Sequence, residues 1–175
     1  MAEPDQETDW IRRSQKGDHE AFGKLIQLHQ RMIHSLAYRM TGSLSDAEDL
    51  AQEVFIRAFH QIRSFRSDAR FASWLHRIAV NQCLNWRKSH DRRERFHEEL
   101  GAVTEAPRDH EGASERVQQA LLQLKPKQRA AVVLTLCEGM NHADAARALG
   151  CSETTVSWRL FIAKRELKRL LQAPA

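Results

Sequence analysis

The stretch NHADAARALGCSETTVSWRL, residues 141–160, decides the fold of the C-terminal half of the chain. Its first part has the spacing of a short helix that ends at Gly150, and Ser152 suits the cap of a longer helix that follows. Small alanines face inward on the first helix, and Val156 and Leu160 on the second, so the two helices can cross closely. A short helix, a turn with glycine and a longer helix form the helix-turn-helix arrangement, whose second helix enters the major groove of DNA.

The outward side chains of the second helix have the chemistry that DNA contact requires. Thr154, Thr155 and Ser157 offer hydroxyl groups, and Arg159 can donate hydrogen bonds as a fork to guanine or to phosphate. A final helix rich in lysine and arginine can also be an ordinary solvated surface. The glycine turn and the capped second helix favour DNA binding. The basic face that continues toward phosphates comprises Lys164, Arg165, Lys168 and Arg169.

The preceding sequence predicts further helices. Apolar residues recur at steps of three and four over residues 18–40, 45–64 and 71–89. Ser45 and Glu48 form a capping box, which predicts that the second of these helices begins at Ser45. No strand-like alternation is present in the sequence.

The helical spacing fades over residues 92–113, where Pro107 and Gly112 interrupt the chain, and this segment is predicted to be a linker. Helical spacing returns immediately afterwards. We therefore expect an all-α chain of two small helical domains, residues 1–91 and 114–175, joined by a flexible linker.

The helix predicted from Ser45 is acidic. Asp46 and Glu48 lie in its first turn, where negative charge is stabilised by the helix dipole. The dipole does not account for a contiguous acidic and amide surface that continues past the first turn, namely Asp49, Gln52 and Glu53. Such a surface repels DNA and attracts a basic protein surface.

The helix predicted over residues 71–89 is basic instead. Its cations and amides alternate with aromatic residues, a mixture that suits single-stranded or melted DNA because exposed bases stack on aromatic rings. The aromatic residues can equally belong to the core, and Trp74 lies on the inner stripe. The helix supplies the cations Arg77, Arg87 and Lys88, the amides Asn81, Gln82 and Asn85, and the rings of Phe71, Trp74 and Trp86. Arg92, Arg93 and Arg95 continue the basic tract beyond the helix, and Phe65 lies shortly before it.

Composition narrows the class of protein. The chain has 175 residues, a formal net charge of +4 and a sequence pI of about 9.2, which permits nucleic-acid binding. Its three cysteines are widely spaced, which fits a reducing compartment, and Cys83 and Cys137 lie on apolar stripes that predict burial. No histidine or cysteine pair has a convincing metal-ligand spacing, and no catalytic or phosphate-loop motif occurs. We expect a cytoplasmic protein without metal, cofactor, catalytic activity or membrane insertion of its own.

Taken together, these residues resemble the extracytoplasmic-function (ECF) subfamily of bacterial RNA polymerase sigma factors. The stretch DAEDLAQEVF, residues 46–55, is similar to region 2.2 of that family, which docks on the clamp helices of the polymerase β′ subunit. The resemblance implies that the core polymerase is bound by Asp46, Asp49, Gln52, Glu53 and Phe55.

The stretch FRSDARFASWLHRIAVN, residues 65–81, is similar to regions 2.3 and 2.4, in which a loop captures a flipped base of the −10 promoter element. The C-terminal unit resembles region 4, which reads the −35 element and contacts the β flap. At the −10 element the resemblance and the basic helix imply Phe65, Arg66, Ser67, Asp68, Arg70, Arg77, Asn81, Asn85, Arg87 and Lys88. At the −35 element they imply Thr154, Thr155, Ser157, Trp158, Arg159, Phe161, Lys164 and Arg165.

The family resemblance also implies partners: core RNA polymerase, promoter DNA and an inhibitory anti-sigma factor. Trp158 departs from the small or basic residue usual in the family, which leaves the −35 preference open. Two alternatives remain, a sigma-like decoy and a helix-turn-helix regulator that does not act through core polymerase. The retained basic residues on the last helix favour an active factor over a decoy, and the acidic helix favours a sigma factor over a simple regulator.

Overall fold

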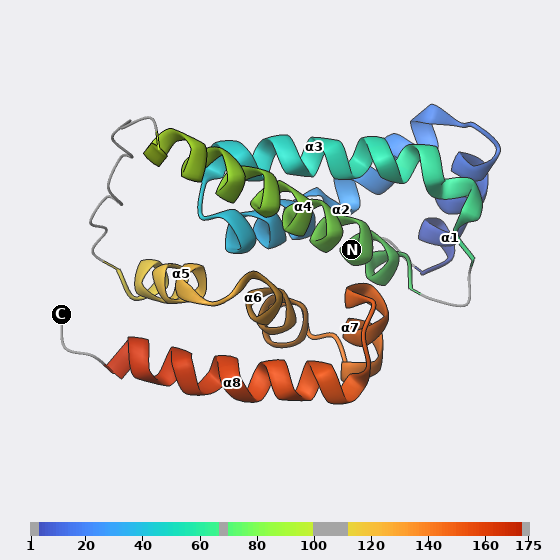
Figure 1. Cartoon of the computed structure of the whole chain (residues 1–175). Coiled ribbons are helices and arrows are strands. Elements are labelled where there is room, and N and C mark those ends of the chain that lie inside the picture. Colours follow the sequence, from blue (N-terminus) through green and yellow to red (C-terminus); the bar gives the residue numbers. More distant parts are fainter. Residues whose placement is uncertain (1–3, 67–69, 100–111, 173–175) are drawn as a thin grey trace.

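Every regular element in the described part of the chain is helical (Figure 1). The structure is a computed structural model that describes residues 4–66, 70–99 and 112–172. Within these ranges no strand occurs, in agreement with the predicted all-α class, and no helix is long and apolar enough to cross a membrane. The N-terminal elements are α1 (Pro4–Gln15), α2 (His19–Thr41), α3 (Leu44–Gln61), the short η1 (Ile62–Ser64) and α4 (Phe71–Glu99). The C-terminal elements are α5 (Ala113–Gln123), α6 (Pro126–Val132), the π-helical turn η2 (Val133–Cys137), α7 (His142–Leu149) and α8 (Glu153–Gln172).

The start of α3 differs from the prediction. Gly42 ends α2 in the left-handed conformation, with φ of +79°, and leaves Ser43 extended. The Ser43 hydroxyl accepts a hydrogen bond from the Asp46 amide at 3.2 Å, so Ser43 is the cap. The predicted cap at Ser45 is therefore wrong, because the left-handed glycine brings the chain into the helix two residues earlier.

The N-terminal unit contains more helix than the sequence predicts. α1, which the apolar spacing does not predict, places Ile11 and Ser14 against α2 with 9% and 2% of their surface exposed. α4 continues to Glu99, ten residues beyond the predicted end at Ser89. α1 to α4 pack against one another around a common core that includes Leu25, Val54 and Leu75.

The C-terminal unit contains the predicted helix-turn-helix. The Asn141 side chain caps α7 by accepting from the Asp144 amide at 2.8 Å. Gly150 ends α7 with φ of +59°, and the Ser152 hydroxyl accepts from the Thr155 amide at 3.2 Å as α8 begins. The fully buried Val156 holds α8 in the core of this unit.

One buried arginine links the two units. Arg129 on α6 is 2% exposed and donates to the carbonyls of Leu121 (2.8 Å), Leu124 (3.3 Å) and Leu122 in its own unit. It also donates to the carbonyl of Met40 at the end of α2. Burial lowers the pKa of Arg129 to about 10, which still leaves the side chain charged at neutral pH. α4 also packs on α7, and α2 on α5, so the two units lie face to face in Figure 1.

The cysteines divide between core and surface. Cys83 is 1% exposed, as predicted, and burial raises the pKa of its thiol to about 12. The predicted burial of Cys137 is wrong, because this residue is exposed at the end of η2. The π-helical turn rotates the chain by less per residue than an α-helix, so the α-helical spacing assigns Cys137 to the wrong face.

Candidate functional site

The acidic surface of α3 faces solvent, as its spacing predicts. Asp49, Gln52 and Glu53 are all exposed, whereas Asp46 is half-buried at the first turn. The Glu53 carboxylate accepts a hydrogen bond from the buried Gln82 side chain of α4 at 2.9 Å. This bond orients one acid of the surface and anchors it to the core of the N-terminal unit.

An apolar hollow of about 540 Å³ adjoins this surface between α2 and α3. Phe55, a predicted contact residue, is 8% exposed and reaches the surface only as part of the hollow's wall. Ile56 beside it is 58% exposed, although the sequence reasoning did not single it out. Acids next to an apolar hollow form a surface suited to a protein partner rather than to DNA. The lining comprises His19, Phe22, Gly23, Ile26, Gln52, Phe55, Ile56 and Phe59.

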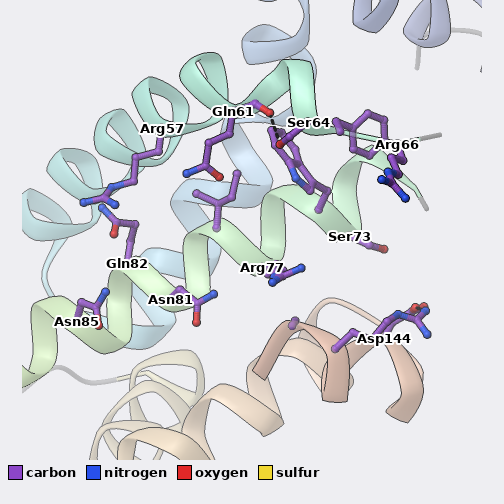
Figure 2. Close-up of a pocket in the computed structure, with 15 residues that line it drawn as sticks. Arg57, Gln61, Ser64, Arg66, Ser73, Arg77, Asn81, Gln82, Asn85 and Asp144 are labelled. Carbon is purple, nitrogen blue, oxygen red and sulfur yellow. Dashed lines mark hydrogen bonds and ion pairs between the residues drawn. The ribbon is translucent and has the colours of Figure 1, made fainter. Parts of the chain in front are cut away.

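Basic residues of the N-terminal unit gather around a second hollow, a cleft of about 810 Å³ between α3, α4 and α7. Figure 2 shows Arg77, Asn81 and Asn85 along α4, with Arg57 on α3 and Arg66 beyond η1 on the same side. Arg66, Arg77, Asn81 and Asn85 are exposed, so cations and amides from segments far apart in sequence are brought together. Arg57 was missed by sequence reasoning, because it stands one turn beyond the acids on a helix assigned to another role.

Three aromatic rings hold the end of this cleft in place. Phe65 and Phe71 are 7% and 4% exposed, and their rings meet edge to face with centroids 5.3 Å apart. The centre of the Trp74 ring lies 5.4 Å from the centre of the Phe65 ring, and Trp74 lines the cleft. Phe65 thus belongs to the core, where it orients the chain rather than offering a free ring face. Ser67 and Asp68, which were predicted to lie in the adjacent loop, are outside the described residues.

The remaining basic residues of α4 have different environments. Arg87 is half-buried and forms an ion pair with Asp91 at 2.7 Å. Lys88 and Arg92 are exposed, as is Arg70 at the start of the helix. Arg87 is therefore partly engaged within its own helix, whereas the exposed cations of α4 are open to solvent.

The outer face of α8 carries a mixed aromatic and polar stripe. Thr154, Trp158, Phe161 and Arg165 follow one another at steps of three and four, and both aromatic residues are 59% exposed. The Arg165 guanidinium lies 5.7 Å from the centre of the Phe161 ring, a cation–π distance.

Other predicted residues of α8 are engaged within the protein. Arg159 is half-buried and donates to the Cys151 sulfur at 3.4 Å, and the Thr155 hydroxyl is bonded to that of Ser152 at 2.9 Å. Ser157 is exposed and lies 3.0 Å from a ring nitrogen of His142. Lys164 is exposed. The most accessible part of the predicted −35 surface is therefore the stripe from Thr154 to Arg165.

A carboxylate joins the two units next to the cleft. Glu138, at the end of η2, forms an ion pair with Arg39 of α2 at 3.1 Å and lies 3.4 Å from the His76 ring of α4. The other ring nitrogen of His76 is buried without a partner. Asp144 and Arg147 of α7 form the opposite wall of the cleft, so in this arrangement the helix-turn-helix covers part of the basic surface. Sequence reasoning missed this bridge, because its members are brought together only by docking of the units.

Comparison with known proteins finds a family match for each half of the chain. Residues 25–93 match the family model Sigma-70 region 2, and residues 114–167 match Sigma-70, region 4. The chain is 40% identical over 160 residues to the ECF RNA polymerase sigma factor SigM of Mycobacterium tuberculosis, covering 89% of this chain and 79% of SigM. It is 32% identical to the RNA polymerase sigma factor NccH of Alcaligenes xylosoxydans, covering 99% and 98% of the two chains.

The fold is also shared with a solved structure of CnrH in complex with the cytosolic domain of CnrY. The TM-score is 0.73 with 26% sequence identity, and the alignment covers 97% of this chain and 99% of CnrH. Family matches in both units, relatives along almost the whole chain and the shared fold lead to one conclusion. The chain belongs to the ECF family of RNA polymerase sigma factors.

Proposed function

We propose that this protein binds core RNA polymerase through the acidic surface of α3 and directs it to promoters through two basic surfaces. The observation that carries the proposal is the spatial separation of charge. Asp49, Gln52 and Glu53 lie exposed beside an apolar hollow, whereas the arginines and amides line a cleft between α3, α4 and α7. A segment that repels DNA and attracts a basic protein is thereby held on a chain of net positive charge.

The cleft beside α4 is the proposed −10 surface, defined here as Arg57, Arg66, Arg77, Asn81 and Asn85. Its arginines can neutralise phosphates, and its amides can pair with the edges of unstacked bases. Capturing an extruded base compensates part of the unstacking cost of melting, which is a few kcal/mol. Of the other predicted residues, Arg70, Arg87 and Lys88 stay proposals for −10 contact, as do Ser67 and Asp68, which lie outside the described residues.

The stripe on α8 is the proposed −35 surface. A recognition helix presents its N-terminal residues to base edges, and Thr154, Ser157 and Trp158 stand there. An exposed indole can contact thymine methyl groups, so we expect Trp158 to recognise bases through apolar contacts. Because the −10 and −35 surfaces belong to one chain, binding of either surface to a promoter raises the effective concentration of the other.

We further propose that catalysis belongs entirely to the polymerase, that the protein works in the cytoplasm, and that an anti-sigma factor inhibits it. CnrH was solved with the cytosolic domain of CnrY. The exposed Ile56 and the hollow beside it offer an apolar site at which an inhibitor can compete with polymerase.

Charge reversal on α3 tests the proposal. Asp49→Lys and Glu53→Lys should each weaken binding to core polymerase at least tenfold, because each places a cation where a basic partner docks. Promoter-specific transcription in vitro should fall in parallel. Glu20→Lys, an exposed acid on α2 outside this surface, is the matched control. A helix-turn-helix regulator acting alone would keep its activity in all three variants, and a wild-type chain that fails to co-elute with core polymerase would refute the proposal.

A further inference from the structure

α1 lies outside both family-model matches, yet it contacts the chain at the point where the loop of the −10 surface begins. Gln15, the last residue of α1, donates through Nε2 to the carbonyl of Ile62 at 3.2 Å and to the carbonyl of Phe65 at 2.9 Å. These carbonyls are 47 and 50 residues away in sequence. Both donor hydrogens of one amide are thus used on a single short turn.

The position of the two carbonyls makes this contact specific. Ile62 opens η1, and its carbonyl also accepts from the Phe65 amide at 3.1 Å, which closes the turn. Phe65 is the last buried residue before the exposed Arg66, and its backbone is already extended. Gln15 therefore fixes the backbone of Phe65, the last buried residue before the chain becomes exposed at Arg66.

A second contact from α1 reaches the same place through the aromatic rings. The Glu7 carboxylate lies 2.8 Å from a ring nitrogen of His29 on α2, and that ring lies 5.4 Å from Phe71. Phe71 packs edge to face on Phe65. The two sides of the loop, before Arg66 and after Arg70, are in this way both braced from α1.

We infer that Gln15 is a positioning residue for −10 recognition: it holds the Ile62–Phe65 turn so that Arg66 meets the promoter in one orientation. The inference rests on the proposed function of the −10 surface. A contact residue that is held in place before binding loses less conformational entropy on binding, so removing the Gln15 hydrogen bonds weakens recognition without removing a contact to DNA.

The test replaces Gln15 by leucine, which has similar size and no donor. Holoenzyme is assembled from core polymerase and each variant, and its affinity is measured for a selected promoter and for the same promoter with the −10 bases scrambled. We expect Gln15→Leu to reduce the ratio of the two affinities about tenfold, the usual effect of one or two lost hydrogen bonds. Affinity for core polymerase and for a fragment carrying only the −35 element should stay at the wild-type value. Gln27→Leu, an exposed glutamine on α2, is the matched control.

Different results would refute the proposed function and the role of Gln15. A wild-type holoenzyme that does not distinguish the two promoters refutes the proposed function itself. A wild type that distinguishes them together with a Gln15→Leu variant that does so equally well overturns the inference. If Gln15→Leu fails to fold, Gln15→Asn supplies the same donors on a shorter side chain that cannot reach both carbonyls. Faster hydrogen exchange at residues 62–66 in that variant, with lost −10 discrimination, supports the inference, and wild-type values for both refute it.

Discussion

Removing the Glu138 carboxylate should loosen the contact between the two units by about 2 kcal/mol. The two partners of Glu138, Arg39 and His76, contribute unequally to this free energy. The Arg39 side chain is 34% exposed, so water screens its ion pair and its loss costs only about 0.5 kcal/mol. The His76 side chain is 6% exposed, and without Glu138 neither of its ring nitrogens has a bonding partner. Leaving such a buried polar group unsatisfied costs about 1–3 kcal/mol.

A change of about 2 kcal/mol corresponds to a roughly thirtyfold shift from docked toward separated units. Single-molecule energy transfer between dyes on α2 and α8, attached at Lys24→Cys and Lys168→Cys, measures that ratio. The exposed Cys137 and the half-buried Cys151 are replaced by serine in the background chain. We expect Glu138→Ala to populate a low-transfer state, and Glu138→Gln to lie between it and the wild type because one acceptor oxygen remains.

Glu166→Ala is the control for the Glu138 experiment, because it removes a carboxylate that pairs with Arg169 on the same helix. The −10 surface is covered in part by α7, so Glu138→Ala should also bind a −10 single strand more tightly than the wild type. Identical transfer distributions for Glu138→Ala and Glu166→Ala, with both proteins folded, would show that the bridge does not hold the units together.

Three further predictions concern the junction between the two units and the reactivity of the cysteines. Replacing Arg129 by methionine should lower the free energy of unfolding in urea by about 3 kcal/mol, since four carbonyls lose a donor; a change below about 1 kcal/mol would contradict the role given to it. Gly42→Ala should lower the melting temperature measured by circular dichroism, because a left-handed alanine costs about 1 kcal/mol and its Cβ collides with Leu122; an unchanged melting temperature would mean that this junction yields freely. Cys83, with a pKa raised to about 12 by burial, should resist a thiol reagent at pH 8 until the protein unfolds. Cys137 should react in the native state, and faster as pH rises, because partial burial raises its pKa and thiolate forms only at higher pH; early labelling of Cys83 would show that the core opens readily.

The helix-turn-helix could be predicted because local residues specify it. Gly150 and Ser152 form their capping hydrogen bonds within four residues of themselves, and each has the predicted role in the structure. The same local reasoning failed at Ser45, where Gly42 and Ser43 had already started the helix. Ser43 and Ser45 are both suitable caps by sequence, and only the backbone geometry shows that Ser43 is the one used.

Other features were hidden from sequence reasoning for physical reasons. α1 has few apolar residues: Ile11 and the polar Ser14 are buried, and Trp10 is partly buried against the core. The apolar spacing that indicates amphipathic helices is therefore weak there. The contact between Glu138 and His76 spans 62 residues and exists only after docking, so no local pattern can contain it.

The π-helical turn η2 has a consequence for how this chain can vary. The Glu138 amide bonds to the Val133 carbonyl five residues back, at 3.0 Å, so the turn holds one residue more than an α-helical turn. Deleting one residue from it would restore ordinary winding and swing all that follows by about 100°. Glu138 would then point away from His76, and the recognition helix would face a new direction although none of its own residues had changed. Relatives that differ by a single insertion or deletion at this turn should therefore differ in how their halves are joined, while still reading DNA with equivalent side chains.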